Sequence, residues 1–172
     1  AGLTAALDML NKGLQVTIYE QAQQLGGALR NYPEEQLPAM VIDAELAVIK
    51  ALRGSLQLNT VFDATIFEDI CETFDAVFVD GQTTVNWALP LEKDTDGRIA
   101  ITPLTGATSR DKVYAGGESD PSRGYNPLME AYAGRKGALS IERFLQKAVV
   151  DYNRENEGPY ESGEGRVYIT GT

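Results

Sequence analysis

The stretch that decides the fold is Ala1-Gly2-Leu3-Thr4-Ala5-Ala6-Leu7-Asp8-Met9-Leu10, together with Val16-Thr17-Ile18-Tyr19-Glu20 shortly after it. The first part is typical of an apolar helix, and the second of a buried strand that ends on an acid. A dinucleotide-binding unit needs this order: the helix directs its amino end at a pyrophosphate, a glycine lets helix and strand pack closely, and an acid further on binds a ribose hydroxyl. Gly2 and Glu20 suit the last two roles. The alternative is an ordinary helix and strand with a surface acid.

Composition narrows the possible functions. The 172 residues are 43% hydrophobic and 23% charged, which is typical of one globular domain with its own core. The formal net charge of −10 disfavours nucleic acid and anionic membrane surfaces as partners. The longest apolar runs are too short to span a bilayer, and no charged start followed by an apolar core indicates a signal peptide. We therefore expect a cytoplasmic location and no membrane partner.

Two residue types are almost absent. The sequence has no histidine, and Cys71 is its single cysteine, which excludes a structural zinc site, an iron–sulfur cluster, a Ser-His-Asp triad and a Cys-x-x-Cys pair built from this chain alone. Redox chemistry would have to come from a bound organic cofactor. Cys71 lies in a segment of helical character, and we expect a half-buried packing residue, with a reactive thiol as the alternative.

The rest of the sequence alternates between predicted helices and strands. Gly13 and Gly54 are expected to end helices, Gly26-Gly27 suits a loop that approaches a ligand closely, and Pro127 is expected to open the last helix. Helices are predicted over 3–12, 38–52, 66–73 and 127–148, and strands over 14–20, 56–62, 75–79, 98–102 and 112–115. Residues 149–172 are polar, rich in glycine and acidic, and are expected to form an extended carboxyl-terminal tail.

Ordered sequence blocks along residues 1–148 carry a family resemblance. The blocks are Ala1-Gly2-Leu3-Thr4-Ala5-Ala6, Val16-Thr17-Ile18-Tyr19-Glu20, Gly26-Gly27-Ala28-Leu29-Arg30, Leu37-Pro38, Asp75-Ala76-Val77-Phe78, Gly97-Arg98-Ile99, Val113-Tyr114-Ala115-Gly116-Gly117-Glu118, and Met129-Glu130-Ala131 with Gly134-Arg135. In this order and spacing they resemble the FAD domain of the glutamate synthase small-subunit (beta chain) type of pyridine nucleotide oxidoreductase, a family that includes the flavin module of dihydropyrimidine dehydrogenase.

The resemblance implies a Rossmann-like α/β domain, which is a doubly wound parallel sheet with helices on both faces. Relatives carry a strand before the first helix, and this sequence begins after it. We therefore expect the strand through Ile18 to lie beside the strand through Val113, with a gap between them. Relatives also carry an inserted NAD(P)H domain, and this sequence runs through residues 79–81 without it.

The resemblance also implies roles in binding FAD, and it assigns no catalytic acid or base. Gly2 would pack at the first helix, Glu20 would bind the adenosine ribose, Val61 would offer its backbone to adenine, and the pyrophosphate and flavin edge would be lined by Gly26, Gly27 and Arg30. Gly117 and Glu118 stand where the family has a Gly-Asp pair near the ribityl chain. Asn126, Pro127, Leu128 and Met129 would direct backbone N–H groups and a helix dipole at flavin N1 and O2. The alternatives are a solvated charge at Arg30, a cap at Glu118 and a plain turn at Gly26-Gly27.

The function implied is that of an FAD-binding domain in an NAD(P)H-dependent oxidoreductase, which passes electrons through the flavin to an iron–sulfur protein or a larger oxidoreductase subunit. NAD(P)H would be a substrate only where the inserted domain is present, so the 172 residues alone are expected to hold FAD weakly or not at all and to oxidise little or no NAD(P)H. One alternative is a truncated, non-enzymatic module that keeps the fold, binds no FAD and serves in assembly. Another is a different nucleotide binder that uses only Glu20 and the first helix.

Overall fold

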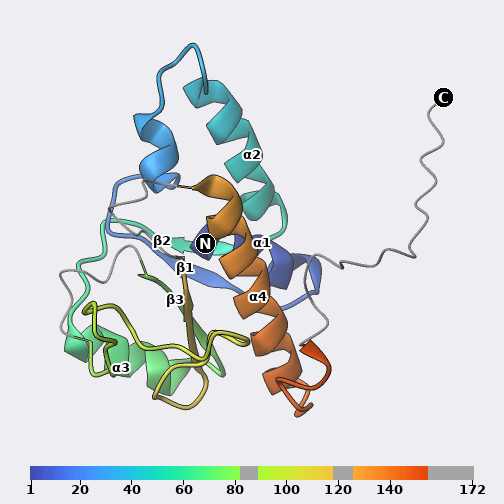
Figure 1. Cartoon of the computed structure of the whole chain (residues 1–172). Coiled ribbons are helices and arrows are strands. Elements are labelled where there is room, and N and C mark those ends of the chain that lie inside the picture. Colours follow the sequence, from blue (N-terminus) through green and yellow to red (C-terminus); the bar gives the residue numbers. More distant parts are fainter. Residues whose placement is uncertain (82–88, 118–125, 155–172) are drawn as a thin grey trace, which may run out of the picture.

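The computed structural model describes residues 1–81, 89–117 and 126–154 (Figure 1). Over these ranges helices and strands alternate along the chain. They are α1 (Gly2–Asn11), β1 (Thr17–Tyr19), the 3-10 helix η1 (Gly27–Asn31), α2 (Ala39–Ala51), β2 (Ser55–Gln57), α3 (Ala64–Thr73), β3 (Val77–Asp80), β4 (Val113–Gly116) and α4 (Pro127–Leu145). The named strands pair in parallel, which confirms the predicted α/β fold built on parallel strands.

The strands form two small sheets. In one, β1 pairs with β2 and Ile18 lies opposite Leu56; in the other, β3 pairs with β4 and Phe78 lies opposite Tyr114. A cavity separates the sheets, and it is lined by β1 and β3. The predicted gap is therefore present, but its second wall is β3 and not the strand through Val113.

The position of β4 has a physical reason. All four of its residues are buried, and one of its edges pairs with β3. Its other edge is covered by the loop at residues 105–107, because the Ala115 N–H donates to the Gly106 carbonyl at 2.8 Å and Ala107 forms an isolated bridge with Tyr114. With both edges of β4 occupied, the open edge beside the cavity belongs to β3.

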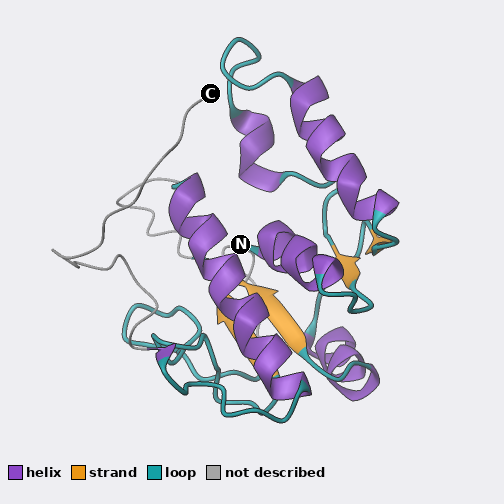
Figure 2. Cartoon of the chain, turned by 90° about the vertical axis from the view of Figure 1, so that its right-hand side faces the viewer, coloured by secondary structure: helices purple, strands orange, loops and turns teal. Residues whose placement is uncertain are grey.

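Helix α4 lies across the β3–β4 sheet and against α1 (Figure 2). The Asn126 side chain caps it by accepting hydrogen bonds from the N–H groups of Leu128 and Met129 at 3.1 and 3.3 Å, and Pro127 occupies the first turn as predicted. The contact with α1 depends on Gly134: a Cβ there would collide with the Ala1 carbonyl oxygen and lie 2.9 Å from Thr4 Cβ. Glycine therefore sets how closely the two helices approach.

Two separate apolar clusters form the core. One joins α3 to the β3–β4 sheet through Phe67, Cys71, Val79, Val113 and Ala115, with two further buried leucines. The other joins α1, α2 and the β1–β2 sheet, and its buried members are Leu10, Leu25 and Ile49. Among the described residues, no helix combines the length and the apolar character needed to cross a membrane.

Two segments differ from the expectation. The predicted strand over 98–102 contributes only an isolated antiparallel bridge between Lys93 and Ile99, because a tight turn closed by Asp94 and Arg98 brings the chain back on itself. The first residues of the predicted tail, 149–154, are turns that fold back on α4. Arg154 is buried there and donates to the Ser140 hydroxyl at 2.5 Å, while Arg143 donates to the Tyr152 carbonyl at 2.8 Å. Residues 155–172 lie outside the described part.

Candidate functional site

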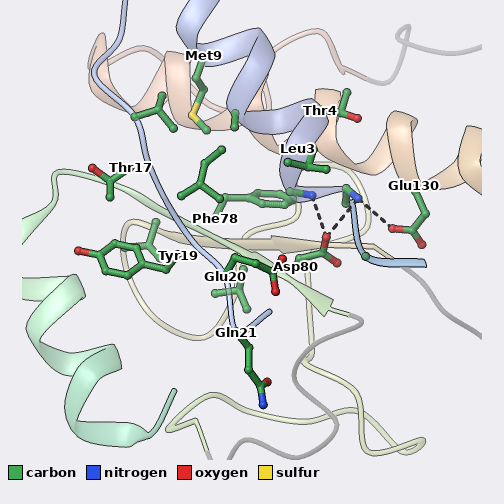
Figure 3. A pocket seen from close by; sticks show the side chains of 18 of the residues that line it. Leu3, Thr4, Met9, Thr17, Tyr19, Glu20, Gln21, Phe78, Asp80 and Glu130 are labelled. Carbon is green, nitrogen blue, oxygen red and sulfur yellow. Dashed lines mark hydrogen bonds and ion pairs between the residues drawn. The ribbon is translucent and has the colours of Figure 1, made fainter. Parts of the chain in front are cut away.

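The cavity between β1 and β3 has a volume of about 380 Å³ and lies at the amino end of α1 (Figure 3). Segments that are distant in sequence meet there: the start of α1, the residues from Val16 to Glu20, the Gly26-Gly27 loop, β3 and the start of α4. In a parallel α/β fold, ligands bind beyond the carboxyl ends of the strands and at helix amino ends. The cavity runs along β1 and β3 and includes such a position at their carboxyl ends, at Glu20 and Asp80.

Two carboxylates hold the amino end of α1. Asp80, the last residue of β3, accepts a hydrogen bond from the Gly2 N–H at 2.9 Å and lies 3.3 Å from the Ala1 nitrogen. Glu130, in the first turn of α4, lies 3.1 Å from the same nitrogen and is only 3% exposed. Its other oxygen, Oε1, has no hydrogen-bond partner among the described residues. Acidic groups at a helix amino end are favoured by the helix dipole.

Gly117 brings the end of β4 to the same place. Its φ of +95° is one that glycine adopts readily, and a Cβ there would lie 2.7 Å from Asp80 Oδ1 and 2.9 Å from Glu130 Oε2. The predicted site residue Gly117 therefore stands beside Gly2 at the amino end of α1. Its predicted neighbour Glu118 lies outside the described residues.

Four of the predicted site residues line the cavity from the other side or from its rim. Glu20 follows β1 directly and accepts a hydrogen bond from the Ala22 N–H at 2.9 Å. Gly26 and Gly27 follow in a turn with φ values of +120° and +46°, and Pro127 of α4 completes the group. Together with Gly2 these residues line one cavity.

Other predicted site residues face elsewhere. The Arg30 guanidinium donates to the Leu25 carbonyl at 2.5 Å and to Asp43 at 2.6 Å, so it is directed toward α2 and does not line the cavity. Val61 is 71% exposed and lies outside the lining. The N–H groups of Leu128 and Met129 are used by the Asn126 cap, and none of these three residues lines the cavity.

The charged side chains of the lining are acidic, and the terminal ammonium of Ala1 is paired with two of them, Asp80 and Glu130. Glu20, Asp80 and Glu130 line the cavity, whereas no lysine or arginine side chain of the described residues does. Sequence reasoning missed Asp80 and Glu130 as site residues. Two signals pointed to them: Asp80 is an acid at the end of an apolar strand, and Glu130 is an acid in the first turn of a helix.

The cavity fits the two ends of FAD unequally. Glu20 offers a carboxylate for ribose hydroxyls. Gly27 leaves room for a close approach, since nothing lies within 4 Å of a Cβ built there, whereas a Cβ at Gly26 would meet the Arg30 side chain. A diphosphate, however, would normally take the N–H groups at the amino end of α1. There the Gly2 N–H already donates to Asp80. Glu20 therefore suits the nucleoside end, and the N–H of Gly2 is already used within the protein.

Known proteins that this chain matches are oxidoreductases. The family of flavin containing amine oxidoreductases matches residues 1–44. The NAD-dependent dihydropyrimidine dehydrogenase subunit PreT of Escherichia coli, in strains O157:H7 and K12, is 36% identical over 103 residues, which are 59% of this chain and 25% of the relative. The beta subunit of the NADP(+)-dependent formate dehydrogenase of Moorella thermoacetica is 36% identical over 81 residues, 46% of this chain and 12% of the relative.

The chain is similar to flavin-containing and pyridine-nucleotide-dependent oxidoreductases. The matched stretch spans a quarter or less of the length of these curated relatives. The family match covers α1, β1, the Gly26-Gly27 turn and the start of α2, and so includes most of the residues on the β1 side of the cavity.

Proposed function

We propose that this chain is the FAD-binding domain of an NAD(P)H-dependent oxidoreductase that passes electrons to an iron–sulfur protein or domain. The observation that carries the proposal is the meeting of the α1 amino end, Glu20 and the Gly26-Gly27 turn at one cavity. When bound, FAD would supply the hydride and electron chemistry. The part of this chain is to bind and orient the cofactor.

Each residue has a physical task in this proposal. Glu20 accepts hydrogen bonds from ribose hydroxyls, and Gly26 and Gly27 keep side chains away from the cofactor. Pro127 places the amino end of α4 at the cavity. Because Asn126 already accepts from the first free N–H groups of α4, this helix acts through its dipole rather than through direct hydrogen bonds.

The proposed partner follows from the chemistry that this chain lacks and from the names of its relatives. A chain without histidine and with one buried cysteine supplies no ligand set for an iron–sulfur cluster of its own. The relatives are named as subunits of dehydrogenases, which supports a place in a larger complex. The single-electron acceptor is therefore proposed to lie on a partner chain or domain.

A titration with FAD tests the proposal. The purified chain should bind FAD saturably, and Glu20→Ala should weaken binding by about 1–3 kcal/mol, because the ribose loses a charged acceptor. Glu35→Ala is the matched control, since Glu35 is exposed and outside the cavity. Retained flavin and its fluorescence give the readout.

Two results would contradict the proposal: a folded chain that binds no FAD, or equal FAD affinity in the wild type and the Glu20→Ala variant. The first result would favour the non-enzymatic assembly module. Dye reduction driven by NADH or NADPH, measured on the same protein, should show little turnover for these 172 residues alone.

A further inference from the structure

We propose that the outer face of α2 is an interface between two copies of this chain, which pack α2 against α2 in antiparallel orientation. The outer face consists of exposed apolar residues: Met40, Val41, Ala44, Ala47, Val48, Ala51 and, directly after the helix, Leu52. The inference goes beyond the proposed function and is independent of it, because none of these residues lines the cavity.

Helix α2 is apolar on two opposite sides. Its inner side holds the buried Ile42 and Ile49, together with Leu46, which packs against the cluster around α1. The helix lies at the edge of the molecule (Figure 1), and on its outer face Met40 is 76% exposed. A surface helix normally carries polar residues on the side away from the core. The outer face of α2 carries none, so it is suited to cover by another surface.

The spacing along the outer face is that of a helix–helix seam. Residues four and then three positions apart form its centre line, and they are Met40, Ala44, Ala47 and Ala51. This alternation is the one with which two helices pack along a common line, and alanine lets their backbones approach closely. Val41 and Val48 lie along one side of the line. Asp43 and Lys50 lie along the other side, so the seam has one apolar and one charged flank.

The charged flank is complementary to itself, which identifies the occupant as a second copy. In an antiparallel pair related by a two-fold axis, each flank faces the same flank of the other copy, so Asp43 lies beside Lys50 of the second copy and the reverse. A parallel pair would set Asp43 beside Val48 instead. Lys50 is exposed and forms no ion pair within the described part of the chain. Asp43 accepts from Arg30, yet its side chain is 63% exposed and remains accessible.

The size of the outer face predicts a weak dimer. Helix α2 has 13 residues and is therefore about 20 Å long, and one helix contact of this length buries less than the roughly 1,200 Å² of a typical stable interface. The net charge of −10 repels two copies in general, so association needs a face without like charges, and salt at about 0.15 M screens charges more than about 8 Å apart. We expect a dissociation constant between about 1 and about 500 μM.

The first test compares Ala47→Glu with Ala64→Glu. Ala47 lies at the middle of the outer face, where the two-fold axis would bring the two introduced charges together. Ala64 is an exposed alanine of α3, away from the outer face and the cavity, so the control changes the net charge equally. Glutamate is a good helix former, and far-ultraviolet circular dichroism checks the fold of each variant. Sedimentation velocity of the whole chain, from about 5 μM to about 1 mM, measures association.

The second test fixes the orientation with a disulfide. Met40 and Ala51 are 11 positions apart in the sequence, so within one copy they lie about 16 Å apart along α2 and cannot be bridged. In the antiparallel pair, position 40 of one copy lies near position 51 of the other. A variant with both Met40→Cys and Ala51→Cys should therefore form a covalent dimer under mild oxidation, whereas each single variant should not. Cys71 is 2% exposed and does not compete.

The wild type and Ala64→Glu should dimerise equally, and Ala47→Glu should weaken association at least about tenfold, because like charges meet in the interface. A wild type that stays monomeric up to about 1 mM would overturn the inference and leave the outer face to a different protein or domain. Equal association of Ala47→Glu and Ala64→Glu would overturn it too, as would single cysteine variants that cross-link as readily as the double variant. FAD binding, tested with Glu20→Ala, is decided separately from all of these results.

Discussion

Cys71 is 2% exposed on α3 and packs with Phe67 in the core, outside the cavity lining. Burial raises the pKa of its thiol; the nearby Arg110 acts in the opposite direction, and Glu68 adds to the rise. The thiolate is the reactive form, so a raised pKa and a closed environment both lower reactivity. Cys71 is buried more deeply than the half-buried packing residue that its sequence indicates.

Alkylation of Cys71 should therefore depend on unfolding. At pH 8, iodoacetamide should label the native protein at least about tenfold more slowly than the protein in urea. Because the folded pKa lies above the unfolded value of about 8.5, the thiol stabilises the fold below that pH, and this contribution is lost as the pH rises through the folded pKa. Mass spectrometry of labelled protein gives the rates, and equal rates in both conditions would contradict the buried position.

At the site, the sequence indicates which residues lie together only where those residues are close in the chain. Glu20 follows its own strand and Gly26-Gly27 follows soon after, so their shared position could be predicted. Asp80 and Glu130 meet only because β3 and α4 pack at the start of α1, and a sequence pattern does not report such contacts. Arg30 faces α2 because Asp43 and the Leu25 carbonyl lie within its reach.

Helices α1 and α4 are in contact at Gly134, whose position a larger residue would disturb. Glycine in a helix interior normally costs about 1 kcal/mol relative to alanine, so a glycine-to-alanine change usually stabilises a helix. At Gly134 the added Cβ would meet the Ala1 carbonyl oxygen, Thr4 Cβ and the Ala5 nitrogen. Two of these atoms belong to the backbone, so no side-chain rotation can relieve the contact.

Gly134→Ala should therefore destabilise the protein by about 1–3 kcal/mol, which is the usual cost of overpacking. Arg135→Ala is the control. Arg135 is next to Gly134 in the sequence, its side chain is 74% exposed, and its ion pair with Asp8 has an N–O distance of 3.9 Å. The control should change the free energy of unfolding by less than about 0.5 kcal/mol. Urea unfolding measures both, and a stabilised Gly134→Ala variant would show that the helices do not approach this closely.

Local signals explain which elements could be predicted. Pro127 and the stripe of apolar residues mark the start and the face of α4, and α2 and α3 are found within two residues of their expected bounds. The sequence over 98–102 has the local pattern of a strand, yet the segment forms only one isolated bridge, at Ile99. A strand needs a partner, and pairing is decided by the whole fold. The 3-10 helix η1 begins at Gly27, directly after Gly26, and two successive glycines give no helix signal.

At the scale of the whole molecule, the described residues form two apolar clusters, and helix α1 connects the two halves that contain them. Helix α1 contributes Leu10 to the cluster around α2 and the β1–β2 sheet, and it also packs against α4 and β3 of the other half. The two halves differ in burial: β4 is buried throughout, whereas Ser55 and Gln57 of β2 are exposed. Regions with fewer buried contacts open more easily.

Hydrogen exchange should reveal this difference. Amides of β4 are expected to exchange at least about tenfold more slowly than those of β2, because opening β4 requires breaking a buried core. Exchange followed by mass spectrometry or nuclear magnetic resonance on the native protein measures both strands. Uniform protection across β2 and β4 would indicate that the halves open only together.

The open strand edges beside the cavity matter during folding as well as in the folded protein. Among the described residues, β1 and β3 each pair with a named strand on one side only, and β3 contains the apolar run Val77-Phe78-Val79. An exposed apolar edge is a template on which other copies of a chain can add, and a charge at its end interrupts that addition. Asp80 stands at the end of this run, and the net charge of −10 keeps copies apart. At this position Asp80 is therefore expected to act as a gatekeeper against aggregation.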